Sequence, residues 1–239
     1  LEVASASYFS YAPDLPVNAL PIGQRIKGGV RIRLRATAGL TFAQTSIDRL
    51  AFFLGGRHDV ANTLYELSLA TGLGAMVLPA DTTAGRGAKP YEFLPATAIR
   101  PVGFADDEAL LPVTLRSFQG YRLLQEYFSF PQRFRFVEVA GLAPAISRLN
   151  VSEIELAILF GRGDSNLENV IDASNFSLFC TPAVNLFSRR ADRIHVNDSA
   201  YEYHVVPDRT RPLVFEVYEV AEVVGYGAGS DSEPRFLPF

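Results

Sequence analysis

The amino-acid sequence predicts an α+β fold dominated by strands, arranged as two tandem small sheet units that each carry a short helix. Apolar and charged residues alternate at 30–35, as in a half-buried strand, and residues 50–54 form a short apolar run before two glycines. After Asp59, apolar residues recur at steps of three and four until Gly72, which indicates a helix. A similar order of patterns begins again at Phe134, and this repetition predicts the second unit.

Residues 1–27 are predicted to form an extended N-terminal arm, because three prolines push the residues before them away from helix. The first β-rich unit follows over residues 28–131. After its helix it continues with a strand at 75–78 and with a strand at 93–104, which its prolines confine to a sheet edge. A linking helix near 117–128 is expected to end this unit.

The second β-rich unit is predicted over residues 132–224, and residues 225–239 are predicted to be a tail that contains glycine and proline. Its strand patterns lie at 134–139, 156–160, 201–206 and 213–220. The apolar residues at 167–173 match the helix of the first unit, at an offset of about 103–106 residues. This similarity indicates a duplication of tandem domains, and one continuous mixed sheet is the alternative.

Composition and charge exclude several classes of function. The 26 acidic and 22 basic residues give a net charge of −4, so no general electrostatic attraction favours nucleic acid or an anionic membrane surface. No apolar run approaches the roughly 18 residues of a membrane-spanning helix. The lone Cys180 cannot form an intrachain disulfide and is predicted to be buried and inert. Leu1 is not an initiator methionine, so the sequence is interpreted as a fragment of a longer chain.

One motif predicts a hydrolase as the alternative function. Gly163, Asp164 and Ser165 follow an apolar strand, and together with Asp192 and His195 they resemble the motifs of GDSL-type serine hydrolases. Ser165 would be the nucleophile, His195 the base and Asp192 the residue that orients the base. Only 30 residues separate Ser165 from His195, which leaves no room for the intervening oxyanion-binding blocks. A turn that caps a helix is therefore favoured.

Other polar patterns are weaker. His195, His204 and Asp198 could supply zinc ligands, but their spacing is not compact, so no metal or cofactor is predicted. Residues 106–108 form a carboxylate cluster that could hold a cation or act as paired acids, and a solvated turn is favoured. A β-domain that binds carbohydrate or another ligand would instead show a deep pocket lined by aromatic residues.

Aromatic residues near the linking helix follow a helical period. Phe118, Tyr121, Leu124 and Phe128 recur at the spacing of one helix face. Packing in the core is the favoured interpretation of this face, and a contact with a partner is the alternative.

Several segments resemble the TssF family of type VI secretion baseplate proteins, also called VasA or ImpG. Residues 100–112 and 120–128 look like the central segments of that family. Further matching segments follow in the expected order, at 175–176, 180–187, 189–192 and 203–208. The resemblance covers about residues 28–220.

The resemblance implies a structural subunit of the baseplate wedge that is not an enzyme and acts through protein–protein contacts. It implies TssG, a second TssF copy, TssK, TssE and the VgrG spike as partners, without nucleic acid and without direct membrane insertion. The implied location is the cytoplasm, at the inner face of the bacterial inner membrane. No catalytic residue or cofactor comes with this resemblance.

Arg189, Arg190 and Asp192 are the candidates for contact with a partner. Asp192 alone cannot neutralise two adjacent guanidinium groups, so at least one arginine is expected to pair with another acceptor. That acceptor would lie either elsewhere in this chain, which is favoured, or on a partner such as TssG.

Overall fold

The computed structural model of the chain describes residues 1–80, 91–111, 118–227 and 234–236. The chain forms two compact units, Leu1–Ala183 and Val184–Phe239. Among the described residues, no helix is long and apolar enough to cross a membrane.

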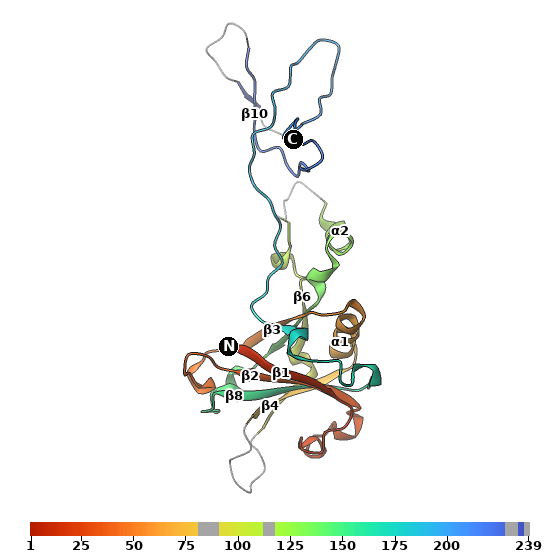
Figure 1. Ribbon diagram of the computed structural model, residues 1–239, viewed down its shortest axis with the longest axis vertical. Coiled ribbons are helices and arrows are strands. Elements are labelled where there is room, and N and C mark those ends of the chain that lie inside the picture. Colours follow the sequence, from red (N-terminus) through yellow and green to blue (C-terminus); the bar gives the residue numbers. More distant parts are fainter. Residues whose placement is uncertain (81–90, 112–117, 228–233, 237–239) are drawn as a thin grey trace. The chain divides into compact units, whose positions relative to one another are not determined.

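The first unit is built on two antiparallel sheets (Figure 1). The larger sheet has the order β1 (Glu2–Phe9), β2 (Gly28–Arg35), β8 (Glu153–Phe160), β4 (Gly72–Pro79) and β5 (Glu92–Pro95). The smaller sheet has the order β6 (Ile99–Val102), β7 (Phe136–Ala140), β3 (Arg49–Leu54) and β9 (Phe176–Ser177).

In the described residues, three α-helices and several 3-10 turns connect these strands. The α-helices are α1 (His58–Ala70), α2 (Arg122–Ser129) and α3 (Ala143–Ile146). The 3-10 turns are η1 (Val17–Ala19), η2 (Gly23–Arg25), η3 (Phe42–Gln44), η4 (Ala96–Ala98), η5 (Asp106–Glu108), η6 (Gln119–Tyr121), η7 (Pro131–Phe134), η8 (Ser165–Leu167) and η9 (Ala173–Asn175). The helix predicted after Asp59 is confirmed as α1, which ends just before Gly72.

The hydrophobic core lies on both faces of the larger sheet. On one face, alternate residues of β2 and β8 pack in the same cluster as residues of α1 and the smaller sheet. On the other face, β4 and β8 contribute to a second cluster with Ala12, Leu15 and Leu20 from the segment before β2. Because β8 is buried on both faces, its sequence is a nearly continuous apolar run instead of an alternating one.

The strand-dominated α+β class is confirmed, but the distribution of the strands differs from the tandem arrangement. β2 pairs with β8, and β3 pairs with β7, so residues 28–131 and 132–224 each contribute strands to both sheets. A period-two pattern specifies which side chains face the core, but it does not specify which strand lies alongside. The duplication of the two halves stays a prediction.

The N-terminal arm and the proline-containing strand also differ in detail from the prediction. Residues 2–9 form the edge strand β1, and only the part of the arm after it is irregular. The strand predicted at 93–104 is divided by η4 into β5 and β6, which lie at edges of different sheets. The edge positions themselves were predicted from Pro95 and Pro101, which cannot donate to a neighbouring strand.

The second helix of the predicted repeat is absent from the described part of the first unit. Two short 3-10 turns, η8 and η9, lie at the two ends of residues 165–175, and an aspartate side chain caps each of them. Asp164 accepts from the backbone N–H of Asn166, and Asp172 accepts from that of Ser174. These local hydrogen bonds favour tight turns over a continuous helix.

The second unit contains little regular structure. Its described strands are β10 (Val223–Val224) and β11 (Arg235–Phe236), which pair with each other. The segments predicted as strands at 201–206 and 213–220 contain no strand in the structure, and residues 213–214 lie in a turn, so that prediction is wrong. A sequence of alternating apolar and polar residues forms a strand only where its backbone N–H and C=O groups can hydrogen bond to a neighbouring strand.

Candidate protein-interaction surfaces

Helix α2 is oriented with its charged face inward. Arg122 and Glu126, four residues apart, are both buried, whereas most apolar side chains of the helix face solvent. We define the aromatic face of α2 as the exposed residues Phe118, Tyr121, Leu124, Tyr127 and Phe128. The prediction that this face packs in the core is therefore wrong.

A buried ion cluster determines this orientation. Glu126 pairs with Arg133 and lies 3.5 Å from Arg122, and its carboxylate accepts the backbone N–H of Leu110 at 3.1 Å. Arg133 also donates to the backbone oxygen of Glu108 at 2.6 Å. Burial lowers the pKa of Arg133, and the neighbouring Arg122 lowers it further. The carboxylate of Glu126 is therefore shared by two buried guanidinium groups.

The carboxylates of η5 complete the cluster. The Glu108 carboxylate accepts the backbone N–H groups of Gly103 and Ala105 at 2.8 and 3.1 Å. Asp106 accepts from Arg122 at 3.1 Å, although its own side chain is 86% exposed. Two of the three carboxylates therefore fix local structure, and Asp107 is exposed. Within the described chain, no group of three His, Cys, Asp or Glu residues is placed to hold a metal ion.

The sequence contained a signal for this cluster that the prediction did not use. Arg122 and Glu126 stand at the i, i+4 spacing of a helical ion pair, on the side of the helix opposite to its aromatic residues. Arg133 carried no such signal, because the turn η7 brings it to Glu126 from outside the helix.

In the second unit, the candidate contact residues have acceptors within the same unit. Arg189 donates to Asp208 at 2.7 Å and to the backbone oxygen of Pro207 at 3.2 Å. Its guanidinium also lies 4.4 Å from the ring centre of Phe215. Hydrogen bonds from Thr210 are the main cause of the lowered pKa of Asp208, and Arg189 contributes to it.

The other two candidates are held in the same way. Arg190 donates to the hydroxyl of Tyr226 at 3.0 Å, and Arg193 lies over the same ring at 4.9 Å. Asp192 accepts the backbone N–H of Arg209 at 2.8 Å. The side chains of Arg190 and Asp192 stay exposed, so they retain surface for an outside contact.

The residues of the hydrolase alternative are divided between the two units. Ser165 is exposed on η8 in the first unit, whereas Asp192 and His195 belong to the second unit. Among the described interactions of Asp192, its carboxylate oxygen Oδ2 accepts from Arg209 and not from His195. Cys180 is exposed, which corrects the prediction of a buried thiol. Its apolar neighbour Phe179 is also exposed, because the chain has left the core after β9.

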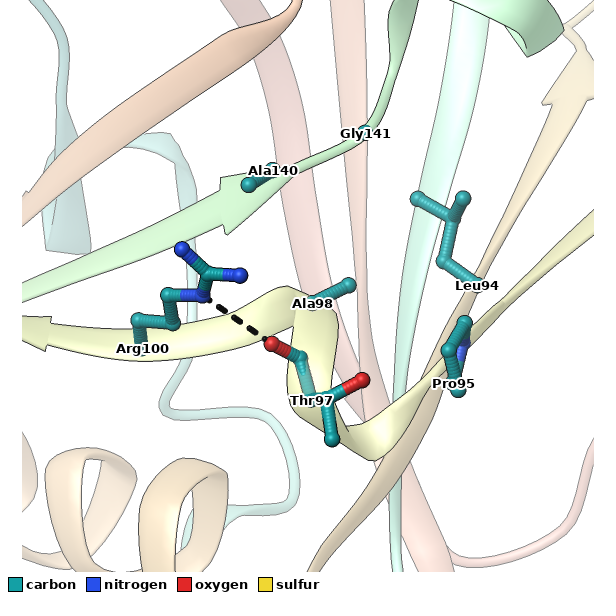
Figure 2. A pocket seen from close by; sticks show the side chains of 7 residues that line it. All are labelled: Leu94, Pro95, Thr97, Ala98, Arg100, Ala140 and Gly141. Carbon is teal, nitrogen blue, oxygen red and sulfur yellow. Dashed lines mark hydrogen bonds between the residues drawn. The ribbon is translucent and has the colours of Figure 1, made fainter.

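Each unit has a cavity among its described residues. Figure 2 shows the smaller one, of about 200 Å³, beside the end of β7. Its only charged lining residue is Arg100, whose Nε donates to the backbone oxygen of Thr97 at 3.1 Å. A groove of about 520 Å³ in the second unit runs between residues 203–207 and 212–217. Its aromatic lining residues are Tyr203 and Phe215.

Comparisons with known proteins identify the family of this chain. The model of the family "Type VI secretion system, TssF" matches residues 1–239. The chain is 46% identical over 239 residues to type VI secretion system component TssF1 of Pseudomonas aeruginosa, and it spans 37% of the length of that relative.

A solved structure shares the fold. One chain of the type VI secretion system TssK-TssF-TssG baseplate subcomplex, solved by cryo-electron microscopy, matches with a TM-score of 0.65 and 23% identity. The match covers 95% of this chain and 39% of the other. Since the family model spans every residue and the curated relative shares nearly half of them, this chain belongs to the TssF family of type VI secretion systems.

Proposed function

We propose that this chain is part of a structural subunit of a type VI secretion baseplate, without a catalytic role, at the cytoplasmic face of the bacterial inner membrane. Membership of the TssF family supports the proposal, as does the shared fold with a chain of a baseplate subcomplex. The subunit acts by presenting surfaces to other proteins.

The orientation of α2 is the observation that carries this proposal. A soluble helix normally buries its apolar side and exposes its charges, and α2 does the reverse. Contiguous exposed apolar surface of this kind is typical of protein–protein contacts. The second unit is consistent with the same role, because none of its described residues is buried.

The proposed partners follow from the family. TssK and TssG are supported by the solved subcomplex, whose name includes both. A second TssF copy, TssE and the VgrG spike are proposed from the resemblance alone. Arg190 and Asp192 are the more accessible contact candidates, whereas Arg189 has three partners inside its own unit.

Reconstitution tests the proposal directly. The full-length protein that contains this chain, mixed with purified TssG and TssK, is expected to elute as one complex whose mass is measured by light scattering. Failure of the three proteins to associate would contradict the scaffold function.

An ester assay tests for catalysis. No turnover of a nitrophenyl ester above that of the Ser165→Ala variant is expected. Turnover that is lost in Ser165→Ala would instead favour the hydrolase.

A further inference from the structure

We propose that the aromatic face of α2 is a docking surface for an amphipathic helix of a partner subunit, and that lysine or arginine flanks the apolar stripe of that helix. The inference rests on the proposed scaffold function and adds the chemistry of one contact to it.

The outward orientation of the aromatic face is fixed by the interior. Rotation of α2 to bury Phe128 would carry Glu126 toward solvent and leave Arg133, which is 1% exposed, without its carboxylate. Loss of the partner of a buried charge is strongly unfavourable. The aromatic face is therefore a fixed property of the folded unit, available before any partner binds.

The composition of the face suits a protein contact. Phe128 is 81% exposed and Phe118 is 78% exposed. The rings of Phe118 and Tyr121 pack edge to face at 5.4 Å, and those of Tyr127 and Phe128 do so at 5.6 Å. Paired rings of this kind are rigid anchors that lose little side-chain entropy on binding.

The shape of the face indicates a helical partner. Tyr121, Leu124 and Phe128 form a convex ridge along α2, at steps of three and four residues. Such a ridge fits the groove between the side-chain ridges of another helix. In Figure 1, α2 lies beyond the end of β6, and the exposure of the three ridge residues shows that they do not pack in the core.

The charges around the face indicate a basic partner. Both arginines of residues 118–134, Arg122 and Arg133, are buried in the ion cluster. The described residues of η5, α2 and η7 carry more acidic than basic groups, with the carboxylates of Asp106, Asp107, Glu108 and Glu126 against the guanidinium groups of Arg122 and Arg133, and all three η5 residues are exposed. A second copy of this chain would bring the same carboxylates to a two-fold contact, where like charges repel. Charge complementarity therefore favours a different subunit with a basic flank.

Hydrogen exchange and photo-crosslinking of the full-length protein test this inference, with purified TssG and TssK as the probes. We expect residues 118–130 to exchange more slowly in the complex than in the free protein. A photo-crosslinking phenylalanine analogue at position 128 is expected to label a basic amphipathic helix of a partner.

Matched variants measure the contribution of the surface. Phe128→Ser is expected to weaken assembly at least ten-fold, whereas Tyr11→Ser leaves it unchanged, because Tyr11 is an equally exposed aromatic residue (82%) outside the face. Asp107→Asn is expected to reduce the salt dependence of binding, whereas Glu66→Gln, at an exposed acid on α1, is not. Melting temperatures of all four variants confirm folding.

The other outcomes overturn the inference in distinguishable ways. A crosslink from position 128 to another segment of the same chain in the free protein would show that its own chain covers the face. Self-association that Phe128→Ser abolishes would assign the face to a second copy, and a label on an acidic segment would refute the basic partner. If a complex forms without slowing exchange at residues 118–130, the inference is wrong and the scaffold function stands. If no complex forms, the scaffold function itself fails, and the inference fails with it.

Discussion

Replacement of Glu126 by glutamine is the most informative test of the buried ion cluster. Glutamine keeps the size of the side chain and an oxygen for the Leu110 N–H, but it removes the charge that compensates Arg122 and Arg133. Glu126 is 3% exposed and Arg133 is 1% exposed, so water cannot replace the lost carboxylate. Breaking a buried pair by removing one partner costs about 3–5 kcal/mol.

This free energy is large enough to measure by thermal unfolding. In a unit of this size, 1 kcal/mol shifts the melting temperature by about 2–4 °C, so Glu126→Gln is expected to lower it by about 6–20 °C. The matched control is Glu66→Gln. Glu66 pairs with Arg162 at 2.8 Å, and both side chains are more than half exposed, so its loss costs at most about 1 kcal/mol. Equal shifts in the two variants would refute the reasoning and show that the cluster is hydrated.

A double-mutant cycle separates the pair from its surroundings. Arg133→Met removes one guanidinium and leaves Glu126 paired with Arg122. Glu126→Gln combined with Arg133→Met is therefore expected to cost less than the sum of the single changes, by about 0.5–3 kcal/mol. Additive effects would show that the two side chains do not interact.

Three further predictions concern other parts of the chain. Hydrogen bonds from Arg35 and Arg33 hold the pKa of Glu153 below its ordinary value. The ionised carboxylate therefore stabilises the fold above the pKa of the unfolded state, and this stabilisation is lost as the pH falls through the pKa of the folded state. In urea unfolding, Glu153→Gln should be less stable than wild type at pH 7 and equally stable in acid. Leu156→Ala, at a buried position of β8, should cost about 2–5 kcal/mol in the same assay, and a smaller loss would indicate a loosely packed sheet. The double variant Arg189→Ala, Arg190→Ala should weaken binding to TssG in a pull-down. Its melting temperature should be nearly unchanged, because exposed charges contribute about 0–1 kcal/mol to folding. A large fall in melting temperature with normal binding would show that these arginines stabilise their own unit and do not contact a partner.

The sequence predicted local structure well where the periodicity of apolar residues within one strand or helix is sufficient to identify it. The alternation at 30–35 predicted a strand, and the period after Asp59 predicted α1, because burial of one face imposes these patterns locally. Pairing was not predictable in this way. Whether β2 lies beside β3 or beside β8 depends on long-range packing, and both choices bury the same side chains.

The candidate surface shows the same limit. Helical spacing of Tyr121, Leu124 and Phe128 correctly indicated an apolar face, and core packing was the expected consequence. The direction of that face is set by Arg133, which the turn η7 brings to Glu126. A contact between a helix and a following turn has no fixed period, so the sequence pattern alone could not reveal it.

The two units differ in what holds them together, and this difference bears on assembly. Ordering each residue costs about 1–2 kcal/mol of backbone entropy, which the first unit offsets with its buried core. The second unit has no buried residue in its described part and depends on contacts such as Arg189 over Phe215. Such contacts contribute about 0.5–1 kcal/mol each at exposed sites, too little to order an extended chain.

Contacts with other protein surfaces are therefore expected to supply the missing stabilisation of the second unit. Amide exchange at residues 184–227 should be fast in this chain alone and slow in the reconstituted baseplate subcomplex, whereas β2 and β8 are protected in both, because they lie in the core. Slow exchange of 184–227 in the chain alone would show that local contacts suffice, and would remove the link between folding of this unit and assembly.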